Sequence, residues 1–264
     1  MTHTRIITVA NQKGGVGKTT STVNIAAAIA QSGPTVLVID MDPQGNASTA
    51  LGATHHEGTS SVYEVLSGEL ALVDVMQACP DIPGLWTVPA TIDLAGAEIE
   101  LVAQVAREYR LARAIDALLA VRHFDYVFLD CPPSLGLLTL NGLVAAREVL
   151  LPIQCEYYAL EGLSQLLRTV DMVRTHLNPG LAVSAILLTM YDGRTRLASQ
   201  VADEVRTHFG AQVLRTVIPR SVRVSEAPSY GQTVVTYDPT SSGALAYREA
   251  AAQVVAMDPK SVST

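Results

Sequence analysis

The segment from residue 5 to residue 20, RIITVANQKGGVGKTT, has the residue types and spacing of a phosphate-binding loop. A β-branched run predicts a strand, three glycines follow within four residues, and a helical pattern begins after Thr19. Glycines let the backbone curl until several N–H groups face one anion, and a helix start adds partial positive charge. Lys18 would reach the β- and γ-phosphates of a nucleotide, and the Thr19 hydroxyl would bind Mg²⁺. The other residues of the predicted nucleotide site are Gly14, Gly15, Val16, Gly17 and Thr20.

Lys13 is a second lysine inside this loop. The usual pattern G-x-x-x-x-G-K-[ST] would need glycine where Gln12 stands. Of the 18 Lys and Arg residues in the chain only three are lysines, namely Lys13, Lys18 and Lys260. A compact ammonium group fits a crowded phosphate pocket better than a broad, planar guanidinium group. The two lysines therefore favour a phosphate site over a glycine-rich turn with incidental lysines.

The run KGGVGKTT resembles the deviant Walker A loop of the ParA/MinD group of P-loop ATPases. The resemblance implies that the cofactors are ATP or ADP with Mg²⁺, and that the reaction is Mg²⁺-dependent hydrolysis of ATP to ADP and phosphate. It also implies that Lys13 reaches across a dimer interface to the partner's nucleotide, so that the active site is complete only in an ATP-bound homodimer. Lys13 and Lys18 are then both catalytic. A side chain at Gly14 would push the two facing loops apart.

Two carboxylates are expected beside this loop. Asp42 follows the apolar run VLVID, and Asp130 ends the apolar run FDYVFLD. Ligands of open α/β sheets bind outside the carboxyl ends of the strands, where both residues fall. The resemblance assigns Asp42, in a D-x-D-P-Q-G-N segment, to orienting the attacking water and to the metal site with Thr19. It assigns Asp130, before the second switch segment DCPPS, to holding Mg²⁺ through water, whereas Asp40 is the weaker candidate.

Two segments of the C-terminal half, DGRT at 192–195 and IPRSVRVSEAPS at 218–229, resemble segments of chromosomal ParA (Soj) proteins. In that family, surface arginines bind double-stranded DNA without sequence preference once the dimer has formed. Carried over by position, the DNA-binding residues are Arg194 and Arg223, with Arg196 and Arg220 as neighbours. The resemblance also implies that Met190 and Pro219 enclose the adenine ring.

The net charge of −7 is unevenly distributed along the chain. Residues 1–106 hold three basic and ten acidic side chains, which gives −7, whereas residues 107–264 hold 15 of each. Residues 194–223 carry six arginines against two acidic residues. A local basic surface can bind phosphate groups despite a negative total. Composition alone leaves open the alternative that these arginines form ordinary solvated helix faces.

The rest of the sequence alternates apolar strands with helical patterns. Strands are predicted at 6–10, 36–40, 85–89, 124–130, 149–153, 183–189 and 213–218, and helices at 93–120, 158–177, 195–209 and 243–256. This alternation predicts an α/β fold with a single doubly wound, mostly parallel sheet and helices on both faces. We expect one P-loop NTPase domain over residues 1–264, with a disordered tail at 258–264. In the first of these helices, Ile99, Val102 and Val105 are expected on the buried face.

The resemblance implies a cytoplasmic, nucleoid-associated ATPase that segregates chromosomal or plasmid DNA. The resemblance implies that a ParB-type (Spo0J-like) partner stimulates hydrolysis and so releases the dimer from DNA. Because the first strand starts at residue 5, we expect the chain to lack the additional helix-turn-helix domain of larger plasmid relatives.

Three other functions use similar loops. A MinD-like membrane ATPase needs a basic amphipathic C-terminal helix, but residues 254–264 hold one lysine and a proline, so no membrane partner is expected. A nitrogenase-reductase-like electron carrier needs paired cysteines around an iron–sulfur cluster, and Cys131 lacks such partners. A metabolic ligase would show turnover that depends on a small-molecule substrate. The cluster of His55, His56 and Glu57 is not expected to bind a metal, because adjacent residues seldom face one ion.

Overall fold

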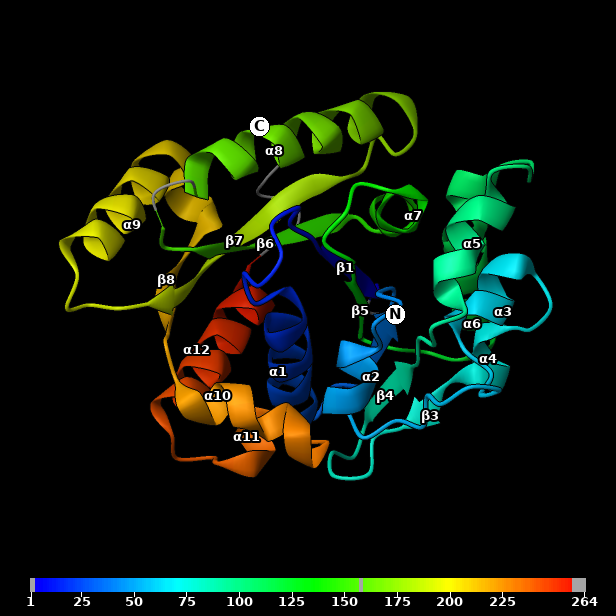
Figure 1. Cartoon of the computed structure of the whole chain (residues 1–264), viewed down its shortest axis with the longest axis horizontal. Coiled ribbons are helices and arrows are strands. Elements are labelled where there is room, and N and C mark those ends of the chain that lie inside the picture. Colours follow the sequence, from blue (N-terminus) through cyan, green and yellow to red (C-terminus); the bar gives the residue numbers. More distant parts are fainter. Residues whose placement is uncertain (1–2, 157–158, 258–264) are drawn as a thin grey trace.

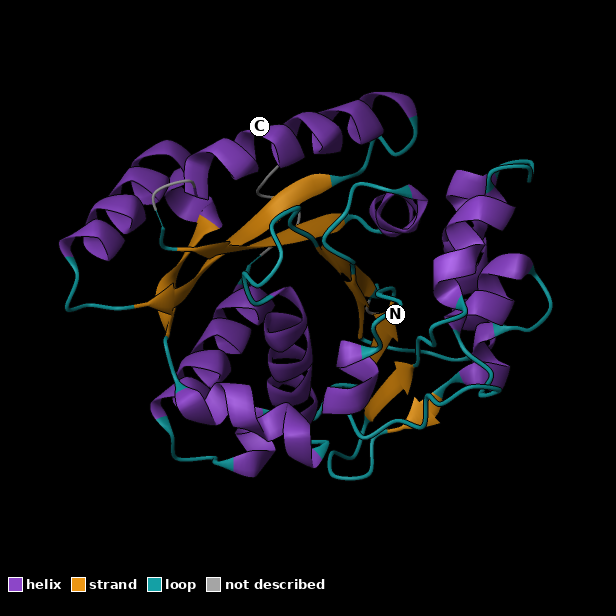
Figure 2. Ribbon diagram, in the orientation of Figure 1, coloured by secondary structure: helices purple, strands orange, loops and turns teal. Residues whose placement is uncertain are grey.

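The computed structural model describes residues 3–156 and 159–257, which form one eight-stranded sheet with helices on both faces (Figure 1, Figure 2). The strands are β1 (Arg5–Val9), β2 (Val36–Asp40), β3 (Gln77–Ala78), β4 (Leu85–Val88), β5 (Tyr126–Asp130), β6 (Glu148–Gln154), β7 (Ala182–Tyr191) and β8 (Val213–Pro219). Their order is β3-β4-β2-β5-β1-β6-β7-β8; β3 is antiparallel to β4, and the other pairs are parallel. The predicted α/β fold is confirmed, whereas the tail at 258–264 lies outside the described residues.

The sheet buries both of its faces, because successive side chains of a strand point to opposite sides. In β2, Leu37 and Ile39 pack into one hydrophobic cluster, and Val36 and Val38 pack into the other. This two-sided burial explains why the strands appear in the sequence as nearly continuous apolar runs.

Each face of the sheet is covered by its own layer of helices (Figure 1). One layer comprises α1 (Lys18–Gln31), α2 (Asn46–Ala50), α10 (Val222–Glu226), α11 (Val234–Tyr237) and α12 (Ser242–Ala256). The other comprises α3 (Val62–Ser67), α4 (Leu72–Val75), α5 (Leu94–Leu101), α6 (Arg110–Val121), α7 (Leu137–Ala145), α8 (Ala159–His176) and α9 (Arg196–Phe209). Short 3₁₀ turns are η1 (Arg107–Tyr109), η2 (Gly210–Gln212) and η3 (Ala227–Tyr230).

The strand order places the glycine loop at the centre of the sheet. β1 lies between β5 and β6, and the chain continues to β2 on one side of β1 and later to β6, β7 and β8 on the other. Ligands of open α/β sheets bind outside the carboxyl ends of the strands, where the strand order reverses in this way. The segments that follow β1, β2, β5, β7 and β8 all begin at this edge.

The predicted helix at 93–120 is interrupted, and part of its predicted buried face is wrong. A turn in which Ala106 adopts a φ of 52° separates α5 from η1 and α6. Ile99, Val102 and Val105, which were expected inside, are exposed. Within α5 the buried positions are Leu94, Ala97 and Leu101, so Ile99 falls outside the buried stripe, whereas Val102 and Val105 lie beyond the last residue of the helix, where its period no longer applies.

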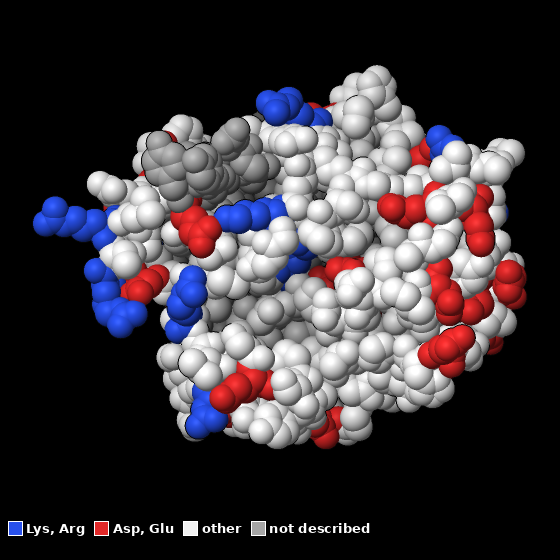
Figure 3. All heavy atoms as spheres, in the orientation of Figure 1, with Lys and Arg blue, Asp and Glu red and all other residues white. Residues whose placement is uncertain are grey.

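Charged side chains gather on different sides of the molecule. Figure 3 shows acidic side chains grouped on the side that carries α3, α5 and α6, whereas most of the visible lysines and arginines lie toward the opposite side. The uneven distribution of charge along the sequence therefore becomes an uneven distribution in space.

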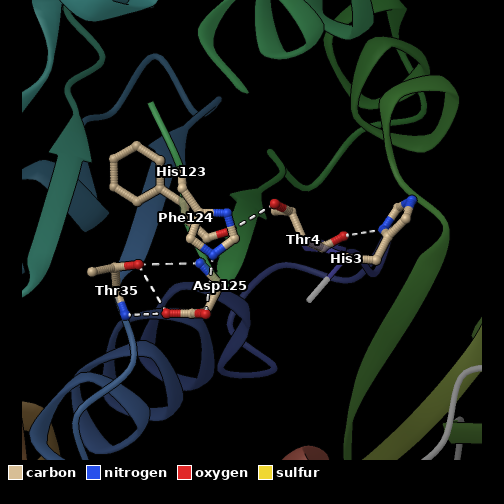
Figure 4. A network of polar contacts seen from close by, with 6 residues as sticks. All are labelled: His3, Thr4, Thr35, His123, Phe124 and Asp125. Carbon is tan, nitrogen blue, oxygen red and sulfur yellow. Dashed lines mark hydrogen bonds and ion pairs between the residues drawn. The ribbon is translucent and has the colours of Figure 1, made fainter. Parts of the chain in front are cut away.

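A polar network joins the starts of β1, β2 and β5, at the sheet edge opposite the glycine loop (Figure 4). Thr35 donates hydrogen bonds from its backbone N–H and its hydroxyl to Asp125 Oδ2, at 2.7 and 2.9 Å. The Thr4 hydroxyl donates to the carbonyl oxygen of Phe124 at 2.6 Å. The backbone hydrogen bond from Thr35 is the main cause of the lowered pKa of Asp125. Its place at this edge gives the network a structural role, which is to align the three strands.

Candidate nucleotide site

The loop between β1 and α1 has the backbone conformation of an anion cradle. Gly15 and Gly17 adopt φ values of 73° and 87°, in the left-handed region that favours glycine. Gly17 is the N-cap of α1, and no side chain caps the first turn. The N–H groups of this turn are therefore available to a ligand, and the helix dipole favours a negatively charged one.

A cavity of about 730 Å³ opens over this helix start. Its lining includes the predicted phosphate-site residues Gly14, Gly15, Gly17, Lys18, Thr19 and Thr20, the carboxylate residue Asp42, and the predicted adenine contacts Met190 and Pro219. Its size lies within the range of cofactor pockets, roughly 300–1,000 Å³. Of the predicted site residues, Lys13, Val16 and Asp130 do not line the cavity, and Val16 is buried behind the loop.

Lys18 is held at the bottom of the loop. Its ammonium group donates to the carbonyl oxygen of Lys13 at 3.1 Å, and the side chain is almost fully buried. Burial lowers the pKa of Lys18, while the negative charges of Asp130 and Asp42 act in the opposite direction. A phosphate group in the cavity would give this buried cation a further counter-charge.

Asp130 is a buried carboxylate with one unused oxygen. Its Oδ1 accepts a hydrogen bond from the Thr22 hydroxyl at 2.8 Å, whereas its buried Oδ2 has no hydrogen-bond partner within 3.5 Å in the described part of the chain; the Thr19 hydroxyl is near enough to lower the pKa of the carboxyl group. Burial raises the pKa of Asp130 to about 7, and the neighbouring charge of Asp40 acts in the same direction. A hydrated divalent cation would satisfy this oxygen and neutralise the carboxylate, so the donor set fits Mg²⁺.

Asp40 and Asp42 differ in their access to the cavity. Asp40 is fully buried and accepts hydrogen bonds from the N–H and the hydroxyl of Ser48 and from the N–H of Asp42. It therefore fixes the loop that follows β2. Asp42 lines the cavity, and its Oδ1 accepts from the N–H of Gln44 at 3.0 Å. Of the two, Asp42 is the carboxylate that lines the cavity, and its role toward a ligand stays a prediction.

The carboxyl end of β7 is joined to the loop by Thr189, a contact that the sequence did not predict. The Thr189 hydroxyl donates to the carbonyl oxygen of Val16 at 2.8 Å. The next residue, Met190, has a φ of 50°, which is unusual for a residue with a Cβ. Strained backbone of this kind clusters at ligand sites. Nothing in the sequence around Met190 predicts this left-handed conformation.

Comparisons with known proteins agree with this geometry. A family model described as an AAA domain matches residues 4–183. The sporulation initiation inhibitor protein Soj of Bacillus subtilis is 51% identical over 252 residues, which are 96% of this chain and 98% of the relative. The chromosome-partitioning ATPase Soj of Thermus thermophilus is 49% identical over 252 residues, 96% of both chains. This chain belongs to the ParA/Soj family of chromosome-partitioning ATPases.

A solved structure of a differently named protein is also similar to this ParA/Soj chain. It is cobyrinic acid a,c-diamide synthase from Mycobacterium smegmatis with a bound ATP analogue and magnesium. It is 41% identical, with a TM-score of 0.83, and the match covers 96% of this chain and 95% of that one. The predicted family and its ATPase activity are confirmed by the relatives, while the roles of individual residues remain predictions.

Two observations concern the alternatives of an iron–sulfur electron carrier and a membrane protein. The Cys131 side chain is fully buried in this ParA/Soj chain, and burial raises the pKa of its thiol, so it is poorly placed to bind a cluster shared between subunits. In the part of the chain that the structure describes, no helix combines the length and apolar character needed to cross a bilayer.

The four predicted DNA-binding arginines are all exposed, but they are not equally free. Arg194 forms two hydrogen bonds with the Asp192 carboxylate, at 2.9 and 2.8 Å. Arg223 lies 3.1 Å from Glu226 and 3.4 Å from Asp238. Arg220 also lines the nucleotide cavity, so its side chain is shared between the outer surface and that cavity. The fourth residue of the set is Arg196, at the start of α9.

Proposed function

We propose that this protein is a DNA-partitioning ATPase whose ATP-bound dimer binds DNA without sequence preference. A ParB-type partner stimulates hydrolysis and so releases the dimer from DNA. The observation that carries the proposal is the meeting of an uncapped helix start, a buried lysine and a cavity-facing carboxylate, Asp42, in one nucleotide-sized cavity. Membership of the ParA/Soj family supports it.

In this proposal the loop N–H groups and Lys18 bind the phosphates of ATP. Thr19, Asp42 and Asp130 hold Mg²⁺, which when bound neutralises charge on the transferring phosphoryl group. Asp42 orients the attacking water, since it is the carboxylate of the loop that lines the cavity. Met190 and Pro219, at the carboxyl ends of β7 and β8, enclose the adenine ring. In phosphoryl transfer the protein accelerates the reaction mainly by positioning the reacting groups and by stabilising the charge of the transition state.

The dimer is supported by two features of the loop. The Lys13 side chain projects to the surface rather than into its own cavity. A Cβ added at Gly14 would meet nothing within 4 Å inside the same chain, and Gly14 has no left-handed φ. Neither backbone conformation nor a protein contact within the chain therefore requires glycine at position 14, so the requirement is expected to come from the nucleotide or from a facing loop.

Binding to DNA is supported by the exposure of Arg194, Arg196, Arg220 and Arg223. Two such surfaces joined in one dimer double the number of phosphate contacts, so the affinity rises and its salt dependence steepens. An arginine surface that reads only phosphates carries no sequence information, as the proposal requires. DNA-bound protein would be found on the nucleoid in the cytoplasm.

Gel filtration with ATP or ADP, each with and without nonspecific duplex DNA, tests this function. We expect a dimer with ATP and a monomer with ADP. We also expect the protein to co-elute with DNA when ATP is present and not when ADP is present. Co-elution that does not depend on the nucleotide would contradict the switch. Turnover that depends on a metabolic substrate and not on DNA would instead favour the ligase alternative, since one of the similar solved structures is named as a synthase.

A further inference from the structure

The end of α5 exposes aliphatic side chains that the protein core does not use. Ile99, Val102 and Val105 follow one another at intervals of three residues and are 78%, 59% and 89% exposed. Residues three apart lie on neighbouring positions of a helical turn, so Ile99 and Val102 face the same side. Single exposed aliphatic residues are common, whereas contiguous exposed apolar patches are typical of interaction sites.

The surroundings of this group are acidic. Residues 19–106 contain ten Asp and Glu residues and no Lys or Arg. α3 packs beside α5, where the Tyr63 hydroxyl donates to Glu100 at 2.8 Å. The hydrogen bond to Glu100, followed by burial and the charges of Glu100, Glu69 and Glu64, raises the pKa of Tyr63. Figure 3 shows the acidic side chains gathered on this side of the molecule.

The nearest arginines are Arg107 and Arg110, and both already have partners within the chain. Arg107 donates to Glu108 and to the carbonyl oxygen of Val102. Arg110 donates to the carbonyl oxygens of Leu66 and Ser67. Arg107 therefore neutralises Glu108, with 39% of its side chain exposed, and neither arginine is paired with the carboxylates of α3 or α5.

The same helix contacts the segment that follows Asp130. The Glu98 carboxylate, on α5, accepts a hydrogen bond from the N–H of Leu138 in the first turn of α7 at 3.4 Å. It also lies against Gly136, the N-cap of α7. The Thr139 hydroxyl, in the same turn, donates to the carbonyl oxygen of Ser134 at 2.7 Å. A change in α5 can therefore reach the loop between the buried Asp130 and α7.

We propose that the α5 surface, defined by Ile99, Val102, Val105 and Glu100, binds a basic amphipathic segment of a partner protein. The aliphatic group would receive the apolar face of the segment, and the surrounding carboxylates would attract its lysines or arginines. Through Glu98 and α7, the bound segment acts on the loop after Asp130 and changes the rate of ATP hydrolysis. This inference rests on the proposed function, because it supplies the docking site of the stimulating partner.

A synthetic 18-residue Lys/Leu amphipathic helix is the probe, and a Glu/Leu helix of the same pattern is its control. Fluorescence anisotropy would measure binding to the full chain and to Ile99→Ser/Val105→Ser. We expect the double variant to bind about tenfold more weakly, as for the loss of two apolar anchors. Val121→Ser removes an equally exposed aliphatic residue at the end of α6 and is expected to bind like the parent chain.

Equal binding by the double variant and Val121→Ser would overturn the proposal, as would equal binding of the two peptides. Loss of the ATP-dependent dimer in the double variant would assign the surface to a second copy of the chain instead. ATP turnover with DNA, measured on the same samples, is expected to change with the Lys/Leu peptide in the parent chain and not in the double variant. Absence of ATP-dependent DNA binding in the parent chain itself would count against the proposed function, independently of the peptide results.

Discussion

The ammonium group of Lys13 lies 2.7 Å from the carboxylate of Glu156 in the same chain. Both side chains are about half exposed, so the ion pair contributes roughly 0–1 kcal/mol in water. It nevertheless gives the Lys13 ammonium group a partner within its own chain. The pair therefore competes with the contact that Lys13 would make across a dimer.

Removing this competition is expected to favour the dimer. With Glu156→Gln, sedimentation velocity with a non-hydrolysable ATP analogue should show the dimer at a protein concentration up to about fivefold lower, the effect of an ion pair of this strength. Glu249→Gln, which changes the charge equally at an exposed position of α12, is the control. Lys13→Ala should stay monomeric. An unchanged or weakened dimer in Glu156→Gln would show that this ion pair does not restrain Lys13.

Asp42→Ala is expected to trap the ATP-bound dimer. Without the carboxylate that faces the cavity, the attacking water loses its orienting group, and turnover should fall by about 10²-fold or more. Phosphate release and gel filtration with ATP would measure the two effects. Asp203→Ala, on the exposed side of α9, should behave like the parent chain. An Asp42→Ala protein that remains monomeric with ATP would refute the water-orienting role.

Arg194→Glu and Arg223→Glu are each expected to abolish ATP-dependent DNA binding and to leave nucleotide binding intact. Reversal of charge turns an attraction to phosphate into repulsion on both copies of the surface. Anisotropy of a labelled nonspecific duplex would measure DNA binding, and a fluorescent nucleotide would measure the cavity. Arg113→Glu, exposed on α6, is a charge-matched control. Unchanged DNA affinity in both variants would remove the assignment of this surface.

The bidentate pair between Arg194 and Asp192 gives a separate prediction. The hydrogen bonds from Arg194 lower the pKa of Asp192 to about 2, so the carboxylate stays ionised and competes with DNA phosphate for the guanidinium group. Asp192→Asn should therefore strengthen DNA binding by about two- to fivefold at low salt, and less at high salt. Glu204→Gln, the same change of charge on α9, should have a smaller effect. Weaker DNA binding in Asp192→Asn would mean that Asp192 positions Arg194 instead.

The stability of the metal-free protein should depend on pH through Asp130. Its pKa is raised from 3.8 to about 7 by burial, so between about pH 4 and 7 the folded state binds more protons at this site than the unfolded state. The contribution of Asp130 to the free energy of unfolding is therefore present at low pH and is lost as the pH rises through 7. Calorimetry should find a smaller drop in Tm between pH 5 and 7.5 for Asp130→Asn than for the parent chain. Parallel pH profiles would contradict this assignment.

The fold and the phosphate loop could be predicted because their signals are local. Glycines at 15 and 17 are needed where the backbone itself adopts a left-handed φ, and the adjoining strand and helix are recognisable within a few residues. The buried parallel strands are continuous apolar runs, so their number and order along the chain could be read directly. Asp42 and Asp130 could be placed at the ligand-binding edge because they follow such strands.

The sequence alone thus determined the elements, the phosphate loop and the carboxylates at the ends of the strands. Tertiary structure decided which side chains meet: Lys13 with Glu156, Thr189 with the loop, and Asp40 beside Asp130. It also decided that Ile99, Val102 and Val105 face outward, against their apolar pattern. Periodicity shows which residues are able to be buried. Whether they are buried depends on where a helix breaks and which distant segments pack against it, and these contacts join residues far apart in the chain.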